Sequence, residues 1–155
     1  MTPPHEGVRR ILVIANRTCP CPSLADEVAL RANAAPTDVL VVAPALNSRL
    51  RHWLSDIDDA LTRAQERLEL AITALCRRGV VARGEIGDAD PVLAIEDALA
   101  SFPADEIVIA TLPAGRSNWI ERRLVEKATA RFGIPIAHLV SSVDLAEQAP
   151  ARAAA

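Results

Sequence analysis

The sequence is poor in aromatic residues: two Phe, two Trp and no Tyr occur among 155 residues, although half of the residues are apolar. The core must therefore consist of Ala, Leu, Val and Ile, which suits helices packed on a buried sheet. No apolar run approaches the roughly 18–20 residues of a membrane-spanning helix, and the polar start of the chain lacks the layout of a signal peptide. We therefore expect a cytoplasmic protein of a single domain, since domains usually have about 100–200 residues.

Cysteine is also scarce, because three residues are too few, and odd in number, for a disulfide framework. Cys19 and Cys21 flank a proline, but structural zinc needs about four ligands and the histidines are scattered. We therefore expect ordinary thiols and no metal site.

Lysine is rare, since Lys127 is the one lysine, and the chain has no net positive charge, since its formal net charge is −3. A nucleic-acid-binding protein normally has a surplus of basic residues. The histidines, at positions 5, 52 and 138, show no spacing typical of a catalytic triad. We therefore expect neither a nucleic-acid-binding protein nor an enzyme, and we assign no catalytic residue.

Short apolar runs rich in β-branched residues alternate with longer segments of helical periodicity, a pattern typical of buried strands and their crossover helices. We predict strands at 10–15, 37–43, 80–86, 105–111 and 134–140, and helices at 23–32, 56–78, about 91–101 and about 119–131. Such alternation predicts an α/β fold, a single open five-stranded parallel sheet with helices on both faces. The domain should span 1–144 and be followed by a disordered tail at 145–155.

Individual residues predict where these helices begin and end and which of their side chains face the core. Ser23 and Asp90 are placed to cap the first and third helices, and Gly79 follows the second helix. Leu61 belongs to the apolar stripe of that long second helix, and Cys76 is expected to be a small core residue on its inner half.

A ligand site is expected where the first, second and fourth strands end, because open parallel sheets bind ligands beyond the carboxyl ends of their strands. The loops at these ends are rich in hydrogen-bonding groups, and the last helix begins beside them, so an anion such as phosphate is favoured. The alternative is that the same residues form turns, cap the helix and face solvent. The candidate binding residues are Asn16, Thr18, Pro44, Thr111, Gly115, Arg116, Ser117 and Asn118.

Over residues 9–140 the sequence resembles the universal stress protein family. The segment 11–18 resembles the first strand of the family and its Asp-Gly-Ser turn, with Asn16 in place of Asp and Thr18 in place of Ser. The segment 87–91 resembles the Gly-Asp-Pro segment of the family. The segment 109–140 resembles the signature of the family, which consists of a strand, the phosphate loop, a helix and the last strand. The resemblance implies an adenine-nucleotide-binding domain with strand order 3-2-1-4-5.

The phosphate loop departs from the family pattern. Ala110 and Pro113 stand where the first two glycines belong, and Arg123 and Leu124 stand where Gly-Ser belongs. Proline has no amide to donate to a phosphate, and glycine allows the closest backbone approach. Arg116 could replace lost amides through its planar guanidinium.

The resulting interpretation is a binding or regulatory module of the stress response, without turnover. We expect that the module requires no cofactor and that it binds ATP or AMP weakly at the strand ends. The alternative is a protein-interaction domain of the same fold that has lost nucleotide binding. The resemblance also implies a homodimer that meets through the last strand, which contains His138.

Overall fold

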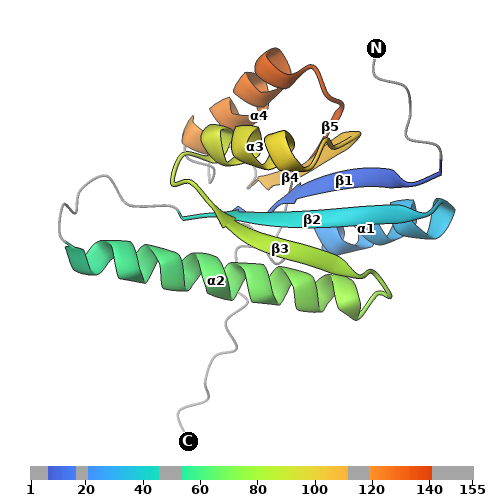
Figure 1. Cartoon of the computed structure of the whole chain (residues 1–155), viewed down its shortest axis with the longest axis horizontal. Helices are drawn as coiled ribbons and strands as arrows, with labels where there is room; N and C mark the ends of the chain where they lie inside the picture. The colour runs from blue at the N-terminus through green and yellow to red at the C-terminus, as the bar shows by residue number, and fades with distance from the viewer. Residues whose placement is uncertain (1–6, 17–20, 46–53, 112–118, 141–155) are drawn as a thin grey trace, which may run out of the picture.

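The computed structural model describes residues 7–16, 21–45, 54–111 and 119–140, without the side chains of 54–57 and 119–122. Strands and helices alternate strictly along the chain (Figure 1). The elements are β1 (Arg9–Ile14), α1 (Pro22–Ala34), β2 (Thr37–Pro44), α2 (Leu54–Cys76), β3 (Ala82–Gly87), α3 (Pro91–Ser101), β4 (Glu106–Thr111), α4 (Trp119–Phe132) and β5 (Ile136–Val140).

The five strands form one sheet in the order β3-β2-β1-β4-β5, and every pair of neighbours is parallel. The predicted fold class and strand order are confirmed. Three of the strands, β2, β1 and β4, lie inside the sheet with helices on both faces, which explains why their sequences contain nearly continuous apolar runs.

Each face of the sheet has its own core. Ile11 and Val13 of β1 belong to the cluster formed with α1 and α2, whereas Leu12 and Ile14 belong to the cluster formed with α3 and α4. All four side chains are fully buried. Burial of each side chain of this kind stabilises the fold by about 1.5–3 kcal/mol, so this strand anchors both layers.

The helix caps are partly as predicted. Asp90 caps α3, because its Oδ1 accepts a hydrogen bond from the amide of Val92 at 2.9 Å. The prediction for Ser23 was wrong: α1 begins at Pro22, and the N-cap is Cys21, whose side chain makes no cap hydrogen bond. Proline is favoured at the first helical position because its φ is already helical, so the helix starts one residue before Ser23.

Among the described side chains of α2, the buried stripe agrees with the predicted one except at Leu61 and Cys76. Leu61 is 42% exposed, and Cys76 is also exposed, so both predictions were wrong. Each residue turns the helix by about 100°, and a neighbour of a core residue therefore lies at the margin of the stripe. The residues that face the core are Ala60, Ala64, Leu68, Ala71 and Leu75.

Candidate functional site at the strand ends

The topology places the switch point of the sheet at the carboxyl ends of β1 and β4. These strands are neighbours, but the chain leaves β1 for α1 on one face of the sheet and leaves β4 for α4 on the other. Open α/β sheets bind ligands where consecutive connections depart to opposite faces. In Figure 1 this end of the sheet is on the left, where β2 runs out toward the start of α2.

Two of the predicted binding residues come together at this point. Ile14 pairs with Ile109, and Asn16 and Thr111 each follow this last pair by two residues, so both lie at the carboxyl ends of these neighbouring strands. Both are only 3% exposed, and within the described residues they are two of three buried polar side chains. A buried polar group needs hydrogen-bond partners. These two residues therefore make the carboxyl ends of β1 and β4 polar, whereas the rest of the two strands is buried in an apolar core.

Thr111 also contacts the last strand. Its Oγ1 lies 2.7 Å from Nε2 of His138 on β5, and His138 is an exposed residue. A threonine hydroxyl both donates and accepts hydrogen bonds, so the contact is compatible with either tautomer of the ring. The residue that ends β4 is thus linked to the edge of the sheet.

The third described candidate, Pro44, is the buried last residue of β2. Its carbonyl accepts a hydrogen bond from Nη2 of Arg67 at 2.6 Å. Arg67 was not predicted, because in the sequence it is one more charged residue between the apolar positions of α2. The signal that could have found it is the length of the arginine side chain. Long side chains on a helix point toward the helix N-terminus, and α2 begins at the end of the sheet where the strands have their carboxyl ends.

The other predicted site residues lie outside the described part of the chain. They are Thr18, Gly115, Arg116, Ser117 and Asn118. Their assignment to the site stays a prediction.

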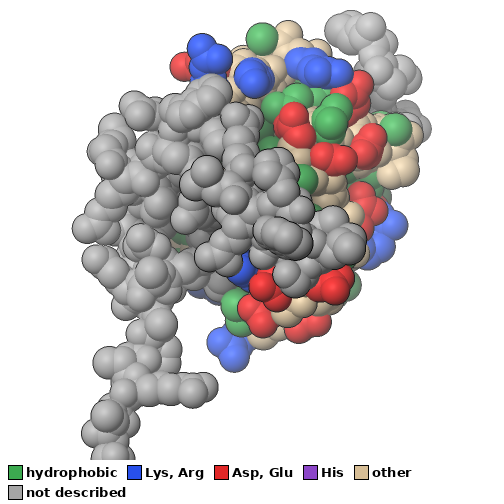
Figure 2. All heavy atoms as spheres, turned by 90° about the vertical axis from the view of Figure 1, so that its left-hand side faces the viewer, with side chains coloured by type: hydrophobic (Ala, Val, Ile, Leu, Met, Phe, Trp, Pro, Cys, Tyr) green, Lys and Arg blue, Asp and Glu red, His purple; other side chains and the backbone are tan. Residues whose placement is uncertain are grey.

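The described surface around the strand ends is acidic. Figure 2 faces this end of the molecule and shows Asp and Glu side chains gathered on its described part. Asp88 and Asp90 follow β3, and Asp58 and Asp59 lie in the first turns of α2, all of them exposed. Exposed carboxylates do not attract an anion, so a phosphate at this end would need positive groups and amides close to the strand ends.

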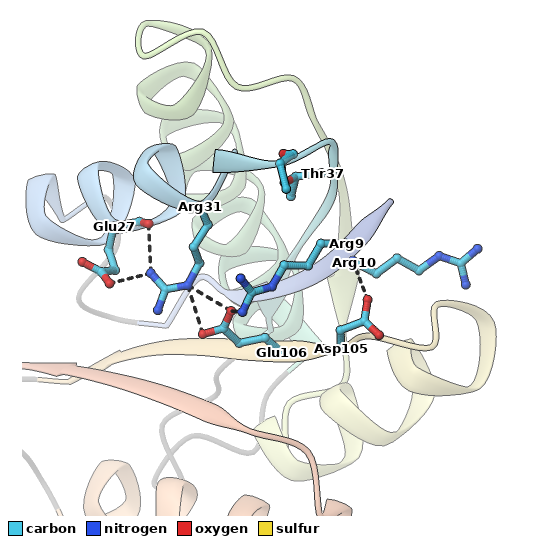
Figure 3. A network of polar contacts seen from close by, with 8 residues as sticks. Arg9, Arg10, Glu27, Arg31, Thr37, Asp105 and Glu106 are labelled. Carbon is cyan, nitrogen blue, oxygen red and sulfur yellow. Dashed lines mark hydrogen bonds and ion pairs between the residues drawn. The ribbon is translucent and has the colours of Figure 1, made fainter. Parts of the chain in front are cut away.

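A separate polar network lies at the opposite end of the sheet (Figure 3). The buried carboxylate of Glu106 accepts from Nη2 of Arg9 at 2.7 Å and from Nε of Arg31 at 2.9 Å. Arg31 also contacts Glu27, 2.5 Å away. The hydrogen bond to Glu106 raises the pKa of the Arg31 guanidinium above its ordinary value. Ligands bind at the other end, so this network supports the fold rather than the site.

Two further findings concern the described residues. They contain no group of three or more His, Cys, Asp or Glu side chains arranged to hold a metal ion. Among them, no helix is long and apolar enough to cross a membrane.

The strand order and the switch point between β1 and β4 define a doubly wound α/β domain of the class that binds ligands at strand ends. No protein-family model matches the sequence, and a search of curated proteins finds no match. Solved structures do match. The universal stress protein from Archaeoglobus fulgidus superposes with a TM-score of 0.63 at 19% identity, covering 84% of this chain and 92% of the other.

Two related structures contain a nucleotide. The Archaeoglobus fulgidus protein in complex with dAMP gives a TM-score of 0.61 at 17% identity, covering 84% of this chain and 96% of the other. A universal stress protein family protein from Arabidopsis thaliana with AMP bound gives 0.56 at 16%, covering 93% and 97%. At these identities the similarity establishes the fold: this chain has the universal stress protein fold.

Proposed function

We propose that this protein is a universal stress protein-like binding module that holds an adenine nucleotide, AMP or ATP, at the carboxyl ends of its strands and does not turn it over. The observation that carries the proposal is the burial of two polar residues, Asn16 and Thr111, at the carboxyl ends of the neighbouring strands β1 and β4, where the switch point of the sheet lies. Structures of the same fold contain AMP or dAMP, which supports an adenine nucleotide as the ligand.

The affinity should be low, in the range of tens of micromolar to millimolar. The predicted phosphate loop lacks glycines and has Pro113, which has no amide to donate. Binding without turnover follows from the sequence, in which no nucleophile has a recognisable base and orienting partner.

The second candidate is a protein-interaction domain of the same fold that has lost nucleotide binding. The altered phosphate loop favours it, with Ala110 and Pro113 in place of the first two glycines. Its partner surface would be the edge strand β5, through which we also propose that the chain forms a homodimer.

Titration calorimetry with AMP and ATP tests the proposal. Wild type should release heat at millimolar nucleotide or below, and Arg116→Ala should weaken binding about tenfold by removing a charge-assisted contact to phosphate. Arg77→Ala is the matched control, because this exposed arginine follows the far end of α2, next to the amino ends of the strands. We expect it to bind as wild type does.

Two results would contradict parts of this view. Absence of heat with either nucleotide would favour the interaction domain. Tight binding that Arg116→Ala leaves unchanged would show that the phosphates lie elsewhere. Mass spectrometry of small molecules that co-purify with the protein extends the test to ligands other than adenine nucleotides.

A further inference from the structure

Arg67 lies in the middle of α2 but reaches the carboxyl end of β2. The helix begins where β2 ends and runs back along β2 and β3 (Figure 1). The side chain follows the helical tendency to point toward the N-terminus, and its Nη2 meets the carbonyl oxygen of Pro44 at 2.6 Å. A contact thus joins residues 23 positions apart, at the end of the sheet where we place the ligand.

The backbone near Pro44 is held from a second side as well. Pro44 is in register with Gly87 of β3, and the amide of Ala45 donates to the carbonyl of Gly87 at 3.2 Å. A substituent on Gly87 would lie 2.7 Å from Cβ of Ala94, so α3 packs directly against this point. The end of β2 is therefore fixed by β3 and, through Arg67, by α2.

The hydrogen bond brings a charged donor to the backbone of a buried residue, because Pro44 is buried and Arg67 carries a guanidinium. A charged donor makes a stronger hydrogen bond than a neutral one. The guanidinium therefore joins α2 to the last carbonyl of β2.

We propose that Arg67 is a positioning residue of the strand-end site, which acts by holding the end of β2 through the Pro44 carbonyl. This inference rests on the proposed function, because it takes the strand end as the place where the nucleotide binds. Loss of the hydrogen bond lets the backbone at Pro44 and Ala45 move, so that the ligand must order it on binding and loses affinity.

Three variants separate this role from simple support of the fold. Arg67→Met keeps the aliphatic stem and removes the donors, Arg67→Lys keeps a charged donor, and Arg63→Met changes an exposed arginine one turn earlier on the same helix. Each variant is compared with wild type for AMP affinity by calorimetry, for unfolding in urea, and for hydrogen exchange at the Ala45 amide without ligand.

We expect Arg67→Met to weaken AMP binding about tenfold and to raise exchange at Ala45 by a similar factor, the loss of one charge-assisted hydrogen bond. Arg67→Lys should recover most of both effects, and Arg63→Met should change neither. A structural role alone would lower the unfolding midpoint without changing the affinity of the protein that remains folded, and this outcome would overturn the proposal.

The exchange measurement keeps the inference independent of the ligand. If wild type binds no AMP, the proposed function fails, but faster exchange at Ala45 in Arg67→Met still shows that Arg67 holds the end of β2. Unchanged exchange at Ala45 in that variant overturns the inference, whether or not AMP binds.

Discussion

Glu106 is a carboxylate buried at the start of β4, and two arginines from different elements surround it. Its side chain is 7% exposed, and that of Arg31 is 17% exposed. Moving such charges out of water is costly, and their attraction repays the cost only when each is well paired. The raised pKa of Arg31 means that the charged guanidinium contributes stability throughout the neutral range, and that this contribution is lost as the pH rises far enough to deprotonate the folded arginine.

We predict that Glu106→Gln lowers the free energy of unfolding by about 1–3 kcal/mol, because it removes a buried charged partner of Arg31 and leaves that partly buried guanidinium with Glu27 alone. Urea denaturation at neutral pH measures the change. The matched control is Glu96→Gln, which breaks an exposed ion pair with Arg131 and should cost about 0.5 kcal/mol or less. Equal losses in the two variants would contradict the role assigned to burial.

The helices on the two faces of β3 limit the size of the side chains that this strand can hold. A Cβ on Gly84 would lie 2.6 Å from the Cδ1 atoms of Leu68 and Ile72 on α2. A Cβ on Gly87 would lie 2.7 Å from Cβ of Ala94 on α3. The first neighbours are ends of flexible side chains, whereas Cβ of Ala94 is attached directly to the backbone of α3.

We therefore predict that Gly87→Ala costs more stability than Gly84→Ala. Overpacking of this kind costs about 1–3 kcal/mol, and we expect Gly84→Ala near the lower end and Gly87→Ala near the upper end. Glu85→Ala, on the same strand and exposed, should change stability by less than about 0.5 kcal/mol. The three urea midpoints provide the comparison, and the reverse order would show that α3 yields more easily than α2.

The order of elements could be predicted from sequence because it depends on local periodicity and composition. Runs such as that of β1 are buried on both faces and are therefore continuously apolar. The exposure of Leu61 could not be predicted, since it depends on how α2 is rotated against the sheet. A stripe in the sequence determines this rotation only to within about one residue.

The site was less predictable than the fold because its contacts join distant elements. Asn16 was expected at the site from the rule that ligands bind at strand ends, and it lies buried two residues after β1, but its part in binding stays a prediction. The contact between Arg67 and Pro44 spans α2 and β2 and has no local signature. The contact between Thr111 and His138 likewise depends on the register of β4 against β5.

The two edges of the whole sheet differ in their suitability for pairing with another chain. The outer strand β3 exposes the charged residues Arg83 and Glu85, which discourage edge-to-edge pairing. The outer strand β5 exposes Val140 to 57% and has partly buried Ile136 and Leu139. Self-association is therefore expected through β5.

We predict a homodimer at neutral pH in which two β5 strands meet about a two-fold axis. Val140→Arg should give a monomer in sedimentation velocity, because it places a charge within the apolar edge. Val81→Arg is the control, since Val81 is 87% exposed and lies just before β3, at the opposite edge of the sheet. A wild-type monomer at neutral pH would contradict this prediction.

The final prediction is that the dimer is weaker in mildly acidic than in neutral solution, because each β5 strand brings a copy of His138 to the interface. Imidazoles take up a proton between about pH 8 and 5, and two charged copies near a two-fold axis would repel each other and resist burial. The hydrogen bond between His138 and Thr111 can form with a neutral or a charged ring, because a hydroxyl both donates and accepts. The pH dependence should therefore come from the dimer and disappear in His138→Val. Sedimentation velocity of both proteins at pH 7.5 and 5.5 decides this, and a wild-type dimer that is unchanged at pH 5.5 would rule out the histidine effect while leaving the dimer intact.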